Sequence, residues 1–411
     1  MSERPRFVGA LLDPEATRWA WLIIAVYLGA LAVAAVLRVQ GDFKIYYEAG
    51  SRILGGEPVY RLADSNHFLY APLFAIFFAP LAMLPIKLAQ LAWLIVNAVA
   101  LVAFLAGAIV MLFGREYVAT PAILILPLLA CSRLVNNNIE HGQANLPVLA
   151  LVVWSIIFAE EGRRTRLSGL ALAAAILIKP FAILAALFIA LERRWGALAW
   201  TAVFGVAILA APVVILGPTR TISETIAYVH VVSSMTGRYQ LMLTNQSASS
   251  AFERLFSDTQ ADPHLGFYMG LAVEIALIAG ICAWYWRDRG LDGGVLAPGR
   301  LPLVALFCVM PSLAPVSWKS YYAALLVPNM AMLSVLWIDR KPGFEPPRAV
   351  WILFLGSIAL NWVMGNEPNR IALFYSTHFA SSIVMLIALT LLTHTPDRTS
   401  VSEPRMSVSG G

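Results

Sequence analysis

Charged residues are scarce in this chain of 411 residues, where Asp, Glu, Lys and Arg together make up 13%, about half the usual ~25%. Hydrophobic residues make up 59%, against roughly 45–50% in soluble domains. A water-soluble protein of this size could not cover so much apolar surface, because too few polar residues remain. The composition excludes disordered, fibrous, disulfide-rich secreted and nucleic-acid-binding proteins, and it indicates a polytopic membrane protein.

Cysteine is also rare. The three cysteines, Cys131, Cys282 and Cys308, all lie in apolar stretches. Their odd number and the lack of metal-ligand spacing argue against a disulfide framework or a zinc site. We therefore expect inert buried thiols.

The net charge of +5 does not indicate a nucleic-acid partner, because the basic residues stand in short clusters between apolar runs. These clusters are Arg163, Arg164 and Arg166; Arg193 and Arg194; Arg287 and Arg289; and Arg340 and Lys341. Such clusters are typical of the cytoplasmic loops of membrane proteins. The first apolar run, 19–37, follows Arg4, Arg6 and Arg18. It predicts an uncleaved signal anchor with a cytoplasmic N-terminus.

Two apolar runs need interpretation before the spans can be counted. The piece 71–84 contains three prolines and is either a full span or a juxtamembrane or re-entrant helix. If this piece is juxtamembrane or re-entrant, the basic clusters all fall on the cytoplasmic side of the membrane. The run 167–191 has basic clusters at both ends and Lys179-Pro180 in the middle, which predicts two short helices meeting at an external turn.

The sequence thus predicts an all-α membrane protein with about twelve spans and a re-entrant element in the first external loop, 38–87. The predicted spans are 19–37, 88–113, 118–131, 146–159, 167–178, 180–191, 195–216, 266–286, 301–314, 320–338, 349–364 and 377–393. They form a single domain, 1–394, followed by a short disordered cytoplasmic tail, 395–411. Both termini lie inside the cell in this topology.

The unexpected polar residues fall in the predicted external segments, which are 38–87, 132–145, the turn at 179, 217–265, 315–319 and 365–376. Asp42 follows the first span closely, where partial desolvation raises the pKa of a carboxylate and suits it to proton abstraction. The alternative is a solvated loop acid or a partner for Lys44.

The second external segment contains Asn136, Asn137, Asn138, Glu140, His141, Gln143 and Asn145. Side-chain amides supply the paired donors and acceptors that sugar hydroxyls need. The alternative is a solvated turn in which Asn145 caps the next helix. A lone histidine such as His141 is more often structural than catalytic.

Two membrane-edge lysines, Lys179 and Lys319, make a phosphate cradle if they face one cavity; otherwise each snorkels to the interface. In the segment 217–265, Asn245 to Ser247 are candidates to contact a polar headgroup, and Arg254 to bind phosphate. The alternative is an amphipathic helix on the membrane surface. Glu274, within a predicted span, receives no role.

Seven short motifs in this order resemble glycosyltransferase family 87, the polyprenyl-phosphate-mannose-type transferases of the GT-C superfamily. They are Asp42-Phe43 with Tyr46-Tyr47, Pro58-Val59-Tyr60, Tyr70-Ala71-Pro72-Leu73, Gly142-Gln143-Ala144-Asn145, Lys179-Pro180, Asn245-Gln246-Ser247 and Ser317-Trp318-Lys319. The likeness covers roughly residues 40–330. Some family members carry histidines after the Ser-Trp pair, where this chain has Lys319 and Ser320.

The resemblance implies an inverting enzyme of the plasma membrane whose active site faces away from the cytoplasm. It implies a polyprenyl monophosphate donor carrying mannose or a related sugar, and a glycolipid or cell-envelope glycan as acceptor. Asp42 is then the base, and Lys179, Lys319 and Arg254 hold the donor phosphate. The remaining candidates bind sugar or acceptor: Tyr46, Tyr47, Asn138, His141, Gln143, Asn145, Asn245, Gln246 and Ser247.

The sequence has no clear Asp-x-Asp motif, which agrees with a lipid-linked donor, and we expect neither a metal nor another cofactor. A transporter or flippase for lipid-linked sugars is the rival interpretation. Transporters usually carry a two-fold repeat and charged or broken helices near the midplane. Here no repeat is evident, and the polar groups concentrate in the external segments.

Overall fold

The computed structural model describes residues 11–37, 41–256, 265–288, 296, 299–340, 344–364 and 366–393. Within these ranges the chain is all-helical, with eighteen α-helices joined by turns and short 3₁₀ or π segments. The first nine α-helices are α2 (Thr17–Val36), α3 (Gly41–Leu54), α4 (Pro72–Ala82), α5 (Ile86–Phe113), α6 (Pro121–Ala130), α7 (Ser132–His141), α8 (Asn145–Glu160), α9 (Thr165–Ile178) and α10 (Ile183–Leu191). The other nine are α11 (Trp195–Leu216), α12 (Pro218–Gln240), α13 (Ala248–Phe256), α14 (Leu265–Asp288), α15 (Arg300–Val309), α16 (Leu326–Leu333), α17 (Arg348–Asn361), α18 (Asn366–Phe374) and α19 (Thr377–Thr393).

Five helical stretches in the described ranges are long and apolar enough to cross a membrane. They are Pro14–Val33, Ile86–Phe113, Trp195–Leu216, Leu265–Arg287 and Lys319–Ile338. The number rises to seven if the bent pairs α6–α7 and α17–α18 each count as one span. Six shorter apolar helices of 10–17 residues accompany them. The chain is a polytopic membrane protein, as its composition predicts, and the count of twelve spans stays a prediction.

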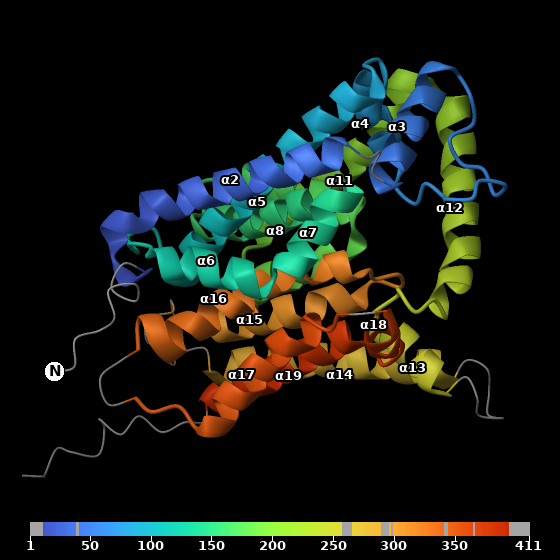
Figure 1. Cartoon of the computed structure of the whole chain (residues 1–411). Coiled ribbons are helices and arrows are strands. Elements are labelled where there is room, and N and C mark those ends of the chain that lie inside the picture. The colour runs from blue at the N-terminus through green and yellow to red at the C-terminus, as the bar shows by residue number, and fades with distance from the viewer. Residues whose placement is uncertain are drawn as a thin grey trace, which may run out of the picture.

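The long helices run roughly side by side, whereas α12 lies across one end of the bundle (Figure 1). α3 and α4 lie near one end of α12 and α13 near the other, at the right of the view. Two apolar cores correspond to this division. The larger core joins the bundle helices, and the smaller one joins α3, α4 and the segment between them to α12.

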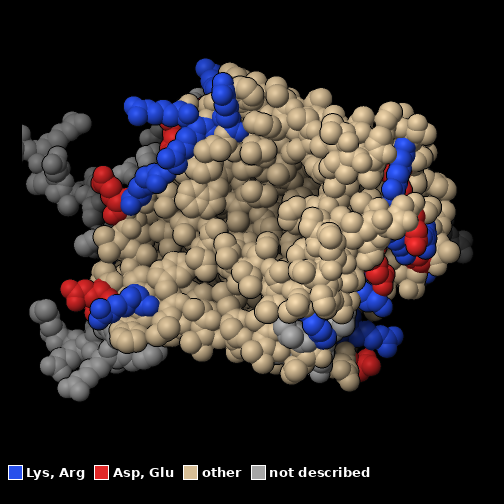
Figure 2. Space-filling view, turned by 90° about the horizontal axis from the view of Figure 1, so that it is seen from above, with Lys and Arg blue, Asp and Glu red and all other residues tan. Residues whose placement is uncertain are grey.

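Charged side chains gather toward two opposite ends of the molecule and leave an uncharged band between them, hollowed near its middle (Figure 2). At one end, ionic contacts join loops that are distant in sequence. Arg300 Nη2 donates to Glu160 Oε2 at 2.8 Å, and Arg115 pairs with Glu161. The basic loops 114–117, 160–166 and 299–300 therefore meet at one end, as expected for loops on one side of a membrane.

The described part of the first external loop, 38–87, is largely helical rather than irregular. In α3 the residues Phe43, Tyr46, Ala49, Gly50 and Ile53 are buried, at the spacing of one helix face. α4 packs closely on this face, because a Cβ on Gly50 would lie only 2.7 Å from the Phe78 carbonyl group. Glycine therefore permits the two helices to approach within backbone contact.

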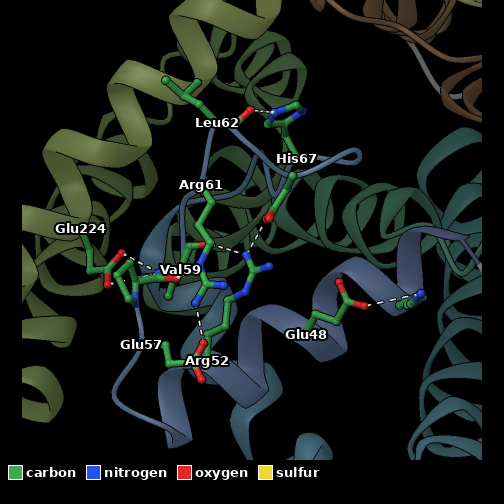
Figure 3. A network of polar contacts seen from close by, with 11 residues as sticks. Glu48, Arg52, Glu57, Val59, Arg61, Leu62, His67 and Glu224 are labelled. Atoms are coloured by element: carbon green, nitrogen blue, oxygen red, sulfur yellow. Dashed lines mark hydrogen bonds and ion pairs between the residues drawn. The ribbon is translucent and has the colours of Figure 1, made fainter.

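Side-chain contacts tie the chain between α3 and α4 to its surroundings (Figure 3). Glu224 of α12 accepts a hydrogen bond from the Val59 backbone N–H at 3.1 Å. Arg52 of α3 donates to the Val59 carbonyl at 2.9 Å and to Asp64 Oδ2 at 2.6 Å. These hydrogen bonds of Glu224 and Arg52 hold the chain so that the following residues, 66–70, lie against the end of the bundle.

The three cysteines are free in the structure. Cys131 and Cys308 are buried, as expected, whereas Cys282 is half-buried. The predicted disordered tail, 395–411, lies outside the described residues.

Candidate active site

A cavity of about 590 Å³ opens at the end of the bundle crossed by α12. Each of the six predicted external segments contributes to its wall. The lining includes Asp42, Tyr46, His67 and Tyr70; Asn137, His141 and Gln143; Lys179; Tyr239, Met242 and Thr244; Val316, Trp318 and Lys319; and Asn369 and Leu373. The polar segments that the sequence scatters over more than 300 residues thus meet at one place.

Asp42 stands in the first turn of α3, where the positive end of the helix dipole favours a carboxylate. Its Oδ2 accepts a hydrogen bond from Gln143 Nε2. Burial raises the pKa of Asp42, while Lys179, His141 and the Gln143 hydrogen bond oppose the rise. The result is a carboxyl group in a position and environment suited to taking a proton.

Lys179 occupies a break in the chain between two short helices. α9 ends at Ile178, and Pro180 opens a 3₁₀ turn, so Lys179 adopts an extended conformation with φ −142° and ψ 111°. A proline cannot continue the backbone hydrogen bonding of a helix, which explains the break. The turn directs a buried ammonium, only 4% exposed as a residue, into the cavity wall.

Aromatic side chains surround this ammonium. Lys179 Nζ donates to Tyr321 Oη at 2.8 Å and lies 4.0 Å from the centre of the Tyr321 ring and 5.4 Å from that of Tyr70. Cation–π contacts of this kind stabilise a desolvated cation. Burial lowers the pKa of Lys179, and the nearby Asp42 carboxylate opposes the shift.

Lys319 lines the same cavity and is partly buried. Among the described residues its ammonium makes no hydrogen bond or ion pair, and Arg133 and Glu140 act on it electrostatically. His141 also lines the cavity, with Nδ1 3.1 Å from the Asn137 carbonyl oxygen. Tyr46 completes this group from α3, its hydroxyl 2.7 Å from that of Tyr70.

Arg254, expected to hold phosphate, does not line the cavity. Its guanidinium donates to the carbonyls of Phe374 at 3.2 Å and Met242 at 2.9 Å, and to the hydroxyls of Ser250 and Ser376. These contacts join α13 to the chain that precedes it and to the α18–α19 junction.

The residues Asn245, Gln246 and Ser247 also lie behind the cavity wall, fully buried. Asn245 Nδ2 donates to the Pro315 carbonyl at 2.9 Å, and its Oδ1 accepts from the Ser317 N–H at 3.0 Å. Ser247 Oγ accepts from the Ser250 N–H at 3.1 Å, which caps the first turn of α13. The structure places these side chains so that they hold the loop carrying Lys319.

Three further candidates do not line the cavity. Tyr47 Oη donates to the Leu84 carbonyl at 2.9 Å, at the junction of α4 and α5. Asn138 and Asn145 are fully buried behind Gln143, where Asn145 Nδ2 donates to Asn138 Oδ1 at 2.9 Å.

Sequence reasoning assigned no site role to several aromatic and histidine side chains of the wall. Tyr70 and Tyr321 flank Lys179, and His67 Nδ1 lies 3.4 Å from Tyr239 Oη in the cavity wall. The tyrosines could have been found from their residue type, because tyrosine and tryptophan are enriched at membrane interfaces. Within the described ranges no three His, Cys, Asp or Glu side chains group as metal ligands.

A second hollow, of about 720 Å³, adjoins the first and is lined almost entirely by apolar side chains. α4, α5, α8, α9, α11 and α12 form its wall, and its residues include Phe74, Phe77, Trp93, Leu151, Ala174, Leu177, Leu209 and Val229. Ile178 lines both hollows, while Tyr70 faces the first and Ala71 the second. Likewise Gln143 lines the cavity and Ala144 this apolar groove.

Comparison with known proteins gives a consistent result. Residues 68–312 match the model of "Glycosyltransferase family 87". A polyprenol-phosphate-mannose-dependent alpha-(1-2)-phosphatidylinositol pentamannoside mannosyltransferase of Mycobacterium tuberculosis is 24% identical over 85% of this chain and 79% of its own length. A polyprenol-phosphate-mannose-dependent alpha-(1-2)-phosphatidylinositol mannoside mannosyltransferase of Mycolicibacterium smegmatis is 27% identical over 88% of this chain and 83% of its own.

A third relative covers less of the chain. An alpha-(1->3)-arabinofuranosyltransferase of Corynebacterium glutamicum is 30% identical over 45% of this chain and 47% of its own length. Gln143 and Lys179 lie inside the residues matched by the family model, whereas Asp42 precedes them.

Proposed function

The chain belongs to glycosyltransferase family 87, and on that premise we propose that it moves a sugar from a polyprenyl monophosphate to a glycolipid or cell-envelope glycan. The sugar is mannose or a related residue, and the anomeric configuration inverts. The names of the two mannosyltransferase relatives support a polyprenyl-phosphate donor and a glycolipid acceptor, and the name of the third supports a related sugar, arabinofuranose.

One observation supports the proposal above the others: a polar cavity with an acid and a cation adjoins an apolar groove at Ile178. A polyprenyl-phosphate sugar has the same division, with a polar head joined to a long hydrocarbon tail. The head fits the cavity beside Lys179, and the tail fits the groove between α4 and α12. The groove is lined almost entirely by apolar side chains, so it receives the tail without desolvating a charged group.

In the proposed reaction Asp42 takes the proton of an acceptor hydroxyl while that oxygen attacks the anomeric carbon. The new glycosidic bond forms as the bond to the phosphate oxygen breaks, and the polyprenyl phosphate leaves with the electron pair. Asp42 must approach the hydroxyl to about 2.6–3.2 Å, directly or through one water. Lys179 stabilises the charge that develops on the phosphate.

The geometry suggests a narrower assignment of the other candidates. Lys319 is the second cation of the cavity, and Tyr46, His141 and Gln143 lie where polar atoms of the substrates pass. The residues 245–247 act through the loop that carries Lys319, with contacts to Pro315 and Ser317. Arg254 acts through the junction of α18 and α19, with contacts to Phe374 and Ser376.

The orientation of the cavity follows from charge. Its end of the bundle is opposite the end where the basic loops meet, and cytoplasmic loops carry the excess of lysine and arginine. We therefore place the cavity on the outer face of the plasma membrane, with both termini inside.

The test is to incubate the purified protein with polyprenyl-phosphate mannose or polyprenyl-phosphate arabinofuranose and a phosphatidylinositol mannoside acceptor, and to analyse the lipids by mass spectrometry. The expected product is the acceptor heavier by one sugar, formed only with the lipid-linked donor. Transfer from a nucleotide sugar instead would overturn the donor assignment. Movement of intact donor across a proteoliposome membrane without any glycosylated product would support the flippase.

A further inference from the structure

Three side-chain amides form a hydrogen-bonded ladder that ends at the candidate base. Asn138 Nδ2 donates to the carbonyls of Ser320 at 2.8 Å and Leu134 at 2.9 Å. Its Oδ1 accepts from Asn145 Nδ2 at 2.9 Å, and Asn145 Nδ2 also lies 3.4 Å from Gln143 Oε1. Gln143 Nε2 donates to Asp42 Oδ2.

The two backbone carbonyls determine which way each amide points. A carbonyl only accepts, so Asn138 must turn its NH₂ group toward Ser320 and its oxygen toward Asn145. Asn145 must then donate, and Gln143 must present its oxygen to Asn145 and its NH₂ group to the carboxylate. Lys179 Nζ, 3.5 Å from Gln143 Oε1, requires the same orientation, because an ammonium cannot accept.

The backbone around Gln143 is also held in place. Gly142 ends α7 in the left-handed conformation, with φ 66°, and its carbonyl accepts from Trp93 Nε1 at 2.7 Å. The Gln143 N–H donates to the Asn138 carbonyl at 2.8 Å. A donor whose main chain and amide orientation are both determined is preorganised for the group that it faces.

We propose that Gln143 is a positioning residue that favours the carboxylate form of Asp42 and turns the second carboxylate oxygen toward the acceptor, and that Asn138 and Asn145 maintain the orientation of the Gln143 amide. The inference rests on the proposed function, since it takes Asp42 as the base. The sequence pattern suggested Asn138 and Asn145 as sugar ligands. The inference instead gives these two amides a structural role, as hydrogen-bond partners within the protein.

Other groups also face Asp42 and belong to any account of its titration. They are His141 of α7, Lys179 at the end of α9, Tyr46 of α3, Tyr70 before α4, Tyr239 of α12 and Tyr321 of the 319–325 turn. Lys179 and His141 act electrostatically to lower the pKa of Asp42, and the ladder adds a neutral donor at one oxygen. Gln143 is therefore the group whose removal changes the hydrogen bonding of Asp42 without changing the local charge.

The experiment measures kcat/KM against pH for the full-length enzyme and for Gln143→Leu, with the donor and acceptor of the transfer assay. A base works when ionised, so activity rises with pH through its pKa. This rise is the acid limb of the pH profile. Loss of the Gln143 donor, which favours the ionised form of Asp42, should move the acid limb to higher pH by about one unit. The donor KM should change by less than about threefold, because the lost interaction acts on the base.

Two further variants separate positioning from folding and from substrate contact. Gln143→Glu conserves shape but adds a second carboxyl group, so its acid limb should also move upward. Asn145→Ala removes a residue that does not line the cavity, and its limb should shift in the same direction by a smaller amount. Asn329→Ala is the control, because this buried amide donates to the Leu325 carbonyl at 2.7 Å and lies outside the ladder.

An unchanged acid limb in both Gln143 variants would overturn the inference, whatever their stability. If instead Asp42→Asn retained normal turnover, the assignment of the base would fail and the ladder would have no catalytic role. The two failures are therefore distinguishable in one set of measurements.

Discussion

The two hollows of this protein are similar in size, about 590 and 720 Å³, and adjoin each other at Ile178, yet they differ in the polarity of their linings. The cavity is lined by an acid, two lysines, amides, histidines and tyrosines, whereas the groove is lined almost entirely by apolar side chains. The cavity gathers residues from segments scattered along the chain, while helices α4, α5, α8, α9, α11 and α12 line the groove.

The difference shows how a membrane protein can orient an amphipathic substrate. A charged head placed in the groove would lose its hydration without gaining a partner, which costs several kcal/mol. A hydrocarbon tail in the cavity would separate Asp42 and Lys179 from their polar neighbours. In the proposed function, each hollow thus rejects the part of the substrate that the other accepts.

The largest expected effect concerns the acid of the cavity. Asp42→Asn keeps the shape of the side chain but removes its ability to take a proton. We expect turnover to fall by about 10²–10⁴-fold, while binding of the prenyl-phosphate donor persists because the groove is untouched. Single-turnover transfer and equilibrium binding of the donor, measured on the same preparation, check both parts. Normal transfer by this variant would show that Asp42 is not the base of the cavity.

A somewhat smaller effect is expected from the cation at the junction. Lys179→Met retains much of the side-chain length without the charge, so the leaving phosphate loses its electrostatic partner. We expect kcat to fall by about 10²-fold and the donor KM to rise. Measuring kcat and KM separately checks this, and an unchanged kcat with a raised KM would restrict Lys179 to ground-state binding.

The role of the apolar groove in binding the donor tail is tested by a substitution that fills the groove. Ala174→Trp places a bulky ring in the groove, so the donor KM should rise about tenfold for a long polyprenyl chain. A donor with a short prenyl chain should be affected little. Leu170→Trp is the matched control, because Leu170 is exposed on the same helix, α9, and does not line the groove. Equal effects on both donors would remove the groove from the binding site.

The smallest effect on catalysis is expected at Arg254, a buried cation outside both hollows. Arg254→Gln breaks hydrogen bonds to Met242, Phe374 and Ser376. We expect it to lower the free energy of unfolding by about 2 kcal/mol, with the donor KM unchanged within about twofold. Thermal unfolding in detergent together with steady-state kinetics measures both. A large rise in the donor KM at unchanged stability would instead support the sequence-based prediction that Arg254 binds phosphate.

Arg254 and Lys179 show where sequence reasoning reaches its limit. Both are cations only 4% exposed in segments that the charge pattern places on one side of the membrane. One lies against the cavity, and the other satisfies backbone carbonyls of chain segments more than 100 residues apart. Nothing in the local pattern separates these cases, because the partners come from distant parts of the chain.

The membrane class, the family and the meeting of the external segments at one cavity could be predicted, because composition and charge asymmetry act over the whole chain. The helical form of α3 follows from its buried residues at Phe43, Tyr46 and Gly50, a signal that was present but masked by polar neighbours. The amides at Asn138, Asn145 and Asn245 could not be assigned. An amide has the same donors and acceptors whether it faces a sugar or a carbonyl of its own chain.

The break at Pro180 has a consequence for what can be changed in this enzyme. The side chain of Lys179 is aimed by the point at which α9 stops, and each residue of an α-helix adds about 100° of rotation and 1.5 Å of rise. Deleting one residue from α9 would turn the ammonium away from Tyr70 and Tyr321 even though every lysine and tyrosine remained. The length of this helix is therefore as much a component of the proposed phosphate site as the charge at its end.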